Sequence, residues 1–143
     1  MTERPLRIDG LDHLLLMVEG MERALRFYRD VLGCTVKTLL PQYGMAELSA
    51  GAQGLDLVDI AAAEGAWARP DIAGGGNLHH FCLAVSVSNE AALRAHLATH
   101  GAAIVEERLE DGRLSLYVED PCGNQVELRF PKPGSIAPGA PIH

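Results

Sequence analysis

The stretch DHLLLMVEGMERALRFYRDVLG, residues 12–33, decides the fold, because a short strand pattern is followed directly by a helix pattern. The run at 12–18 is apolar and lies between glycines, which favours a strand. Apolar side chains then recur every three to four residues up to Gly33, which predicts an amphipathic helix with a glycine at its C-terminus. Strand-like runs follow at about 34–40, 44–50 and 54–60. This half of the chain predicts a β-α-β-β-β order.

The second half of the chain repeats this order. LHHFCLAV at 78–85 matches the first strand, and SNEAALRAHLATHG at 88–101 matches the helix, with Ser88 as the expected N-cap. Strand-like runs follow at about 102–107, 114–119 and 124–130. The offset is 67 residues from His13 to His80 and 71 from Asp56 to Glu127. An internal repeat at a nearly constant offset predicts two similar modules.

The repeat predicts an α+β fold of two tandem β-α-β-β-β modules in a single domain. The expected boundaries are residues 8–130 for the domain, about 8–60 and 78–130 for the modules, 61–77 for the linker and 131–143 for a Pro/Gly-rich tail.

Composition excludes several classes of protein. The chain has 143 residues, 48% of them hydrophobic, and a net charge of −7, which is typical of a globular domain and argues against a nucleic-acid or anionic-membrane partner. We find no signal-peptide pattern and no apolar run of the roughly 18 residues that a membrane span needs. The three cysteines form no CxxC pair, which favours a reducing compartment. We therefore expect a cytoplasmic protein.

Strand alternation places the two histidines and two carboxylates on equivalent faces. His13 and His80 begin the first strand of each module, and Asp56 and Glu127 lie in the last strand, opposite the aliphatic side chains expected to pack on a helix. If the two sheets face one another, the four side chains converge. Imidazole and carboxylate suit Zn²⁺, Ni²⁺, Mn²⁺ or Fe²⁺, and four ligands leave octahedral positions for substrate oxygens. The alternative is a plain pocket without metal.

Four stretches, LDHLLLMV, MERALRFYRDVLG, HHFCLAV and EDPCGNQVELRF, carry a resemblance. Over about residues 8–130 the chain resembles the vicinal oxygen chelate superfamily, which includes glyoxalase I, bleomycin and fosfomycin resistance proteins, methylmalonyl-CoA epimerase and extradiol dioxygenases. The resemblance implies a cupped mixed sheet, frequent dimers, and metal ligands at His13, His80 and Glu127. A homodimer is therefore expected, and the site lies either within one chain or across two.

The fourth ligand that the resemblance implies falls at Asp56. Aspartate is one methylene shorter than the usual residue there, so Glu47 in MAELSAG competes with it. At the HH pair, register with His13 selects His80 as the ligand and leaves His79 outward, because a slip of one residue reverses the face.

The resemblance implies a divalent-metal-dependent lyase or isomerase of glyoxalase I type, acting on a small substrate with vicinal oxygens through proton abstraction and an enediolate. Glu127 would be ligand and proton carrier, Asp56 would assist, and Ser115 and Tyr117 would bind substrate. The alternatives are an extradiol-type Fe(II) dioxygenase and a non-enzymatic protein that binds a small molecule or antibiotic. Basic residues that could hold glutathione carboxylates are only candidates, namely Arg26, Arg29 and Arg129.

Overall fold

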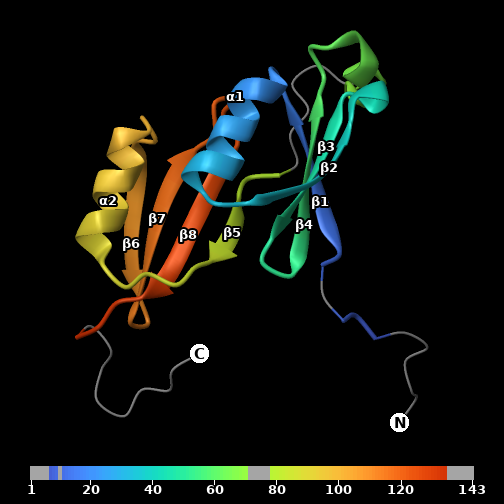
Figure 1. The fold of residues 1–143 in the computed structure, drawn as a ribbon. Helices are drawn as coiled ribbons and strands as arrows, with labels where there is room; N and C mark the ends of the chain where they lie inside the picture. Colours follow the sequence, from blue (N-terminus) through green and yellow to red (C-terminus); the bar gives the residue numbers. More distant parts are fainter. Residues whose placement is uncertain (1–6, 10, 71–77, 135–143) are drawn as a thin grey trace. The chain divides into compact units, whose positions relative to one another are not determined.

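The structure is a computed structural model that describes residues 7–9, 11–70 and 78–134. Its first half contains β1 (His13–Val18), α1 (Met21–Leu25), a π-helical continuation (Arg26–Val31), β2 (Thr35–Leu40), β3 (Met45–Ala50) and β4 (Gln53–Asp59) (Figure 1). Its second half contains β5 (Phe81–Ala84), α2 (Glu90–Thr99), β6 (Ile104–Glu110), β7 (Arg113–Glu119) and β8 (Gln125–Pro131). The predicted α+β class and the repeated β-α-β-β-β order are confirmed.

The strands form two mixed sheets of four strands each, in the orders β1-β4-β3-β2 and β5-β8-β7-β6. In both sheets the first strand of the module pairs parallel with the last, and the other pairs are antiparallel. The parallel register sets Leu15 beside Asp56 in one sheet and Cys82 beside Glu127 in the other. These pairs are equivalent under the sequence repeat, so both modules have the same register.

Contacts within the chain define two compact units that do not coincide with the sequence repeat. Unit 1 comprises Met1–Glu22 and Gly33–Arg69, and unit 2 comprises Arg23–Leu32 and Pro70–His143. Most of the helix that follows β1 therefore belongs with the second sheet. One direct link is the buried hydrogen bond from the Tyr28 hydroxyl to Asp120 Oδ2, at 2.7 Å.

The first helix differs from the prediction in its hydrogen bonding. It is α-helical only to Leu25, and from Arg26 it is a π-helix, in which the Leu32 amide donates to the Phe27 carbonyl at 3.0 Å. Phe27 and Tyr28 are both buried there, with ring centroids 5.0 Å apart. Gly33 follows with φ +86°, as expected of a glycine after a helix end.

The N-cap of α2 is Asn89, so the prediction of Ser88 was wrong by one residue. Asn89 has extended backbone angles, and its side chain accepts a hydrogen bond from the Ala92 amide at 3.0 Å. An N-cap must leave the helical backbone region while its side chain reaches the third helical amide. Asn89 meets both conditions, and the helix begins at Glu90.

In β1 the core follows the predicted alternation, whereas β4 and β7 are buried on both faces. Leu16 and Val18 of β1 are buried, whereas Leu15 and Met17, which point to the other face, are 41% and 44% exposed. The largest fully buried aliphatic side chains of the strands are Val18, Leu48, Leu55, Leu57, Val58, Leu116, Val118 and Val126. Burial of each such side chain stabilises the fold by about 1.5–3 kcal/mol. In β1, burial of Leu16 and Val18 also holds the alternate residues on the opposite face.

The predicted linker contains a short helix. Residues Ala63–Ala68 form a 3-10 helix, and Trp67 Nε1 donates to the Tyr43 carbonyl at 2.8 Å. Gly65 is buried, and a Cβ at this position would lie 1.9 Å from the Asp59 carbonyl oxygen, so only glycine allows the close approach. The rest of the predicted linker, 71–77, and residues 135–143 of the predicted tail lie outside the described residues.

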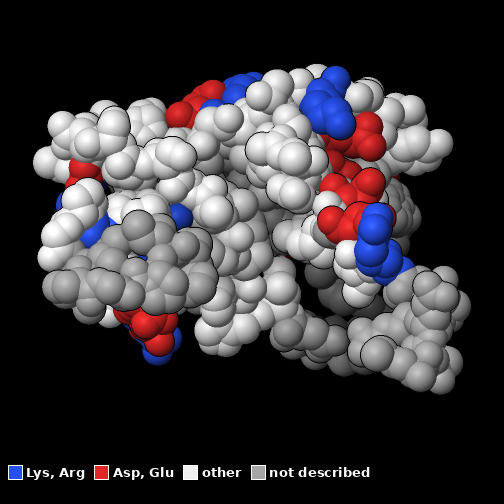
Figure 2. Space-filling view, turned by 90° about the horizontal axis from the view of Figure 1, so that it is seen from below, with Lys and Arg blue, Asp and Glu red and all other residues white. Residues whose placement is uncertain are grey.

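The described surface carries charges of both signs. Seen from below, the basic areas are small and separate on the described part of this face, and acidic surface lies beside them (Figure 2). The described part of this face therefore carries no continuous basic stripe of the kind found on nucleic-acid-binding proteins. Among the described residues, no helix is long and apolar enough to span a bilayer.

Candidate functional site

In unit 2 the structure brings His80 and Glu127 together. His80 Nε2 lies 3.1 Å from Glu127 Oε1, and the Ser115 hydroxyl donates to Glu127 Oε2 at 2.6 Å. Tyr117 pairs with Glu127 across β7 and β8, and its ring centroid lies 5.7 Å from that of His80. We call the sheet face that carries these residues the site face of unit 2. Ser115 and Tyr117 thus contact Glu127, and their predicted contact with substrate stays a prediction.

Hydrogen bonds keep Glu127 ionised although it is buried. Burial raises the pKa of this carboxyl, but hydrogen bonds from Ser115 and Tyr117 and the nearby His80 outweigh it, so the pKa lies below its ordinary value. Burial and the Glu127 charge raise the pKa of the Tyr117 hydroxyl. Glu127 is therefore a carboxylate near neutral pH, the form that binds a metal or accepts a proton.

His79 orients His80. The two Nδ1 atoms lie 2.7 Å apart, so one ring donates to the other, while His80 Nε2 faces Glu127. His79 is exposed, as predicted. Its contact with His80 was not predicted. Histidine ligands commonly use one ring nitrogen for the metal and the other for such a second contact.

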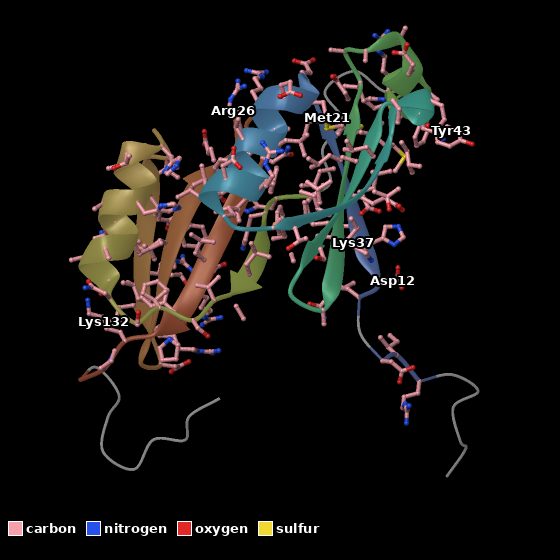
Figure 3. All side chains as sticks on the ribbon, in the orientation of Figure 1. Asp12, Met21, Arg26, Lys37, Tyr43 and Lys132 are labelled. Carbon is pink, nitrogen blue, oxygen red and sulfur yellow. The ribbon has the colours of Figure 1, made fainter. Side chains whose placement is uncertain are left out.

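In unit 1 the corresponding side chains line a pocket of about 470 Å³. His13, Glu47 and Asp56 contribute to its wall, as do Asp12 and Lys37, whose side chains are labelled in Figure 3. The pocket therefore holds one histidine and both carboxylates that competed for the fourth ligand position in the sequence.

His13 has a partner equivalent to that of His80. Its Nδ1 lies 2.8 Å from Asp12 Oδ1, and this hydrogen bond, followed by the charges of Asp56 and Glu47, raises the pKa of His13. No other hydrogen bond of His13 to a described residue occurs. Asp12 and His79 are 67 residues apart, the same offset as the two histidines. That offset was the signal that could have identified both partners.

Asp56 and Glu47 are neighbours across β3 and β4. Asp56 is only 7% exposed, and burial together with the Glu47 charge raises its pKa, although His13 acts in the opposite direction. Asp56 and Glu47 are thus adjacent in the sheet, and only Asp56 is buried. Alternation along the sequence does not report this difference, so it could not choose the fourth ligand.

The geometry of the unit 2 pair fits metal ligands. Two ligand atoms about 2.1 Å from one ion and at right angles to each other are about 3 Å apart, and the His80 to Glu127 distance is 3.1 Å. Within residues 7–9, 11–70 and 78–134, however, no three His, Cys, Asp or Glu side chains form a group that could hold an ion. Of the predicted ligands, His13 and Asp56 thus lie in unit 1, and His80 and Glu127 lie in unit 2. That the four residues form one metal site stays a prediction.

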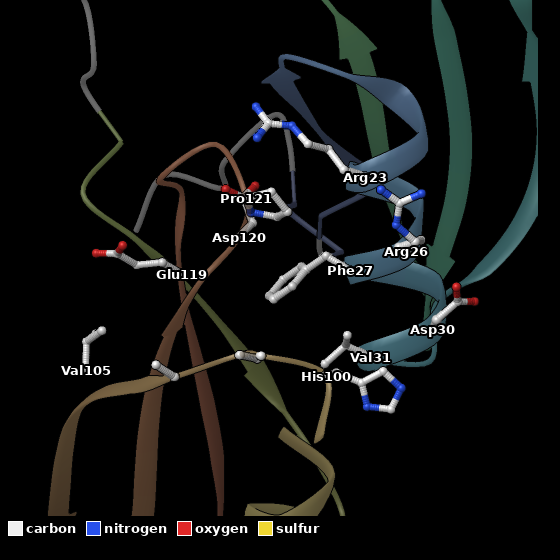
Figure 4. A pocket seen from close by; sticks show the side chains of 13 residues that line it. Arg23, Arg26, Phe27, Asp30, Val31, His100, Val105, Glu119, Asp120 and Pro121 are labelled. Atoms are coloured by element: carbon white, nitrogen blue, oxygen red, sulfur yellow. The ribbon is translucent and has the colours of Figure 1, made fainter. Parts of the chain in front are cut away.

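A second pocket, of about 580 Å³, belongs to unit 2 and lies between the π-helical segment and the start of β6 (Figure 4). Phe27 and Val31 contribute apolar wall, and Arg26 and His100 contribute polar groups. None of the described residues predicted as ligands lines it.

Comparison with known proteins identifies the family. The sequence profile of the Glyoxalase/Bleomycin resistance protein/Dioxygenase superfamily matches residues 10–128. The chain belongs to this superfamily. Membership confirms the resemblance seen in the four sequence stretches and accounts for the paired modules.

Solved structures similar to this superfamily member share its fold. A lactoylglutathione lyase from Agrobacterium tumefaciens is 24% identical with a TM-score of 0.66, covering 87% of this chain and 95% of its own. A putative glyoxalase family protein from Bacillus anthracis is 18% identical with a TM-score of 0.69, covering 90% and 100%. A virulence protein from Salmonella typhimurium is 25% identical with a TM-score of 0.63, covering 87% and 98%.

Proposed function

We propose that the protein is a divalent-metal-dependent lyase or isomerase of the glyoxalase type, acting on a small substrate with vicinal oxygens. The observation that carries this proposal is the contact of His80 Nε2 with Glu127 Oε1 at 3.1 Å, on a carboxylate held by Ser115. An imidazole and an ionised carboxylate at this separation suit adjacent positions around one divalent ion.

The proposed ligands are His13, Asp56, His80 and Glu127, with Glu47 as the competitor of Asp56. Support comes from the matching registers of the two sheets and from the equivalent Nδ1 partners Asp12 and His79. The donor set, nitrogen and carboxylate oxygen, fits zinc, nickel, manganese or iron, and does not choose among them.

Glu127 is the proposed base that removes a proton from the carbon next to a carbonyl. The chemistry that a bound divalent ion supplies is stabilisation of the negative charge on the enediolate oxygens. Ser115 holds Oε2 of Glu127, which orients the carboxylate and leaves Oε1 on the side of His80. Asp56, from unit 1, is the proposed assisting carboxylate.

The test compares proton exchange in wild type and Glu127→Gln. The probe is the hemithioacetal of glutathione and methylglyoxal in deuterium oxide, followed by NMR, with metal content measured in both proteins. An amide cannot accept the proton, so we expect exchange to fall by about 10²–10⁴-fold. The control is Glu119→Gln, an exposed glutamate on β7, which should exchange like wild type.

Three outcomes would redirect the proposal. Unchanged exchange in metal-loaded Glu127→Gln would exclude Glu127 as the base. Oxygen consumption with catechol and no exchange would favour the extradiol dioxygenase. Protein that contains no divalent metal after purification without chelators would favour the third candidate, a non-enzymatic binding protein, which the exposed Leu15 and Met17 on the His13 face also favour.

A further inference from the structure

Arg129 follows Glu127 by two residues along β8, so both side chains lie on the site face of unit 2. Its Nε is buried and forms no hydrogen bond, and the guanidinium makes no ion pair or hydrogen bond with any described residue. Arg129 as a whole is half-buried, but a buried N–H donor without a partner costs free energy. No described acceptor satisfies this N–H, so the position favours a further acceptor, for which an anionic oxygen is suited.

The residues that flank Arg129 in the sheet are small. Ala84 on β5 and Ser115 on β7 flank it in the sheet register, and both side chains are small. The nearest carboxylate on the same strand, Glu127, already contacts His80 and Ser115. Both carboxylate oxygens of Glu127 are therefore already in contact with another side chain.

The repeat shows that the fold does not require an arginine here. The offset of 71 residues that relates Glu127 to Asp56 relates Arg129 to Val58. Val58 is fully buried in the equivalent strand. An apolar side chain therefore occupies the equivalent position in the other sheet, and the charge of Arg129 is specific to unit 2.

A second arginine strengthens the positive charge on this face. Arg113 lies on β7 two residues before Ser115. Arg113 and Ser115 alternate with Leu114 along β7, so the Arg113 side chain lies on the site face.

The other arginines considered from the sequence are differently placed. Arg29 pairs with Asp30 at 2.7 Å. Arg26 lines the second pocket (Figure 4), to which none of the described residues predicted as ligands contributes. Of the three candidates, only Arg129 shares a sheet face with His80 and Glu127.

We propose that Arg129 binds an anionic oxygen group of the substrate, a carboxylate or a phosphate, while the reacting carbon lies at Glu127. This inference rests on the proposed function. Two residues along a strand are about 6.6 Å apart, a span that one small molecule can bridge, and the guanidinium fork matches both groups. The substrate class is therefore small anionic carbonyl or hydroxy compounds, such as 2-oxo acids or phosphate esters.

The test measures binding by calorimetry with two matched probes, pyruvate and hydroxyacetone, which differ mainly in the carboxylate. Inorganic phosphate is the third probe, and each titration is run on purified protein before and after chelation. Wild type should bind pyruvate about tenfold or more tightly than hydroxyacetone. Arg129→Met should remove this preference, and Arg129→Lys should keep part of it.

Arg7→Met is the matched control, because it removes the same charge from an exposed position in unit 1, and it should bind like wild type. If Arg129→Met does not fold, the Arg129 Nε–H resonance of wild type, identified by its absence in Arg129→Lys, should shift on addition of pyruvate. Loss of both pyruvate and phosphate binding in Arg129→Met would show that the site takes either anion, and loss of pyruvate binding alone would assign carboxylate.

Failure of this inference is distinguishable from failure of the proposed function. Equal preference for pyruvate in wild type and folded Arg129→Met, or an unmoved Nε–H resonance, would overturn the role of Arg129 even if metal is bound and Glu127→Gln loses exchange. Conversely, an Arg129-dependent preference in protein that binds no metal would support the anion site and contradict the metal-dependent reaction.

Discussion

The Tyr28 hydroxyl donates a 2.7 Å hydrogen bond to Asp120 Oδ2, and both side chains are buried in unit 2. Asp120 also accepts from the amides of Cys122 and Asn124 and from the Asn124 side chain. A single carboxylate therefore organises the turn between β7 and β8 and ties the π-helical segment to it. Because that turn leads into β8, the bond supports the strand that carries Glu127.

Tyr28→Phe should destabilise the protein by about 1–3 kcal/mol, since it removes one hydrogen bond to a buried charge. Urea unfolding at neutral pH is the measurement. Tyr43→Phe is the control, because the Tyr43 side chain is 53% exposed. Equal stabilities of the two variants would show that the Tyr28 hydroxyl contributes nothing to folding.

Asp59 is expected to link stability to pH through the start of the first helix. Its Oδ1 accepts from the amides of Gly20 and Ala61, at 3.1 and 3.0 Å, and its Oδ2 accepts from the Met21 amide at 3.0 Å. Burial raises the pKa of Asp59, but these amides outweigh it, so the pKa lies below its ordinary value. A depressed carboxyl pKa stabilises the fold above the unfolded pKa of about 3.9, and this contribution is lost as pH falls through the folded value.

Asp59→Ala should therefore cost about 1 kcal/mol at pH 7, in line with the loss of a helix cap. The difference from wild type should persist down to about pH 5 and shrink towards zero in strong acid. Asp59→Asn, which keeps one acceptor oxygen, should fall between the two. A difference between wild type and Asp59→Ala that does not change with pH would contradict the assigned role of the charge.

Patterns of burial were readable from the sequence because they are local. This holds best for β1, where the period of two buries Leu16 and Val18 and leaves Leu15 and Met17 exposed. In β4 and β7 the period predicted the strand, but both faces are buried. The internal repeat then predicted an equivalent register in the two sheets, as the structure has it.

Features that depend on distant partners were not readable. Asp59 contacts amides 38 and 39 residues earlier in the chain, and alternation alone gave no sign of this role. The same holds for the helix residues Arg23–Leu32, which belong with unit 2. β6 was expected to end at 107 but extends to Glu110, because Asp111 and Gly112, both with positive φ, form a tight hairpin turn into β7.

The choice between Asp56 and Glu47 as fourth ligand is testable by metal titration. Asp56→Ala should weaken binding of Zn²⁺ or Ni²⁺ by at least tenfold, whereas Glu47→Ala should change it little, if Asp56 is a direct ligand. A chelator competition assay measures both affinities. The reverse order would assign the ligand to Glu47, which lies beside Asp56 across β3 and β4.

The histidine pair gives the last prediction, because its two members have different contacts. His80 Nε2 faces Glu127, so His80→Ala should lose most metal binding. Among the described residues, His79 contacts His80 through the Nδ1 atoms of the two rings. His79→Ala should therefore weaken metal binding by about 10–100-fold, which is the usual effect of losing a partner that orients a ligand. Asp12→Ala should behave like His79→Ala, since Asp12 holds His13 in the same way. The control is His100→Ala, which should bind metal like wild type, because His100 lies at the end of α2. Greater loss of metal in His79→Ala than in His80→Ala would mean that the register with His13 does not identify the ligand.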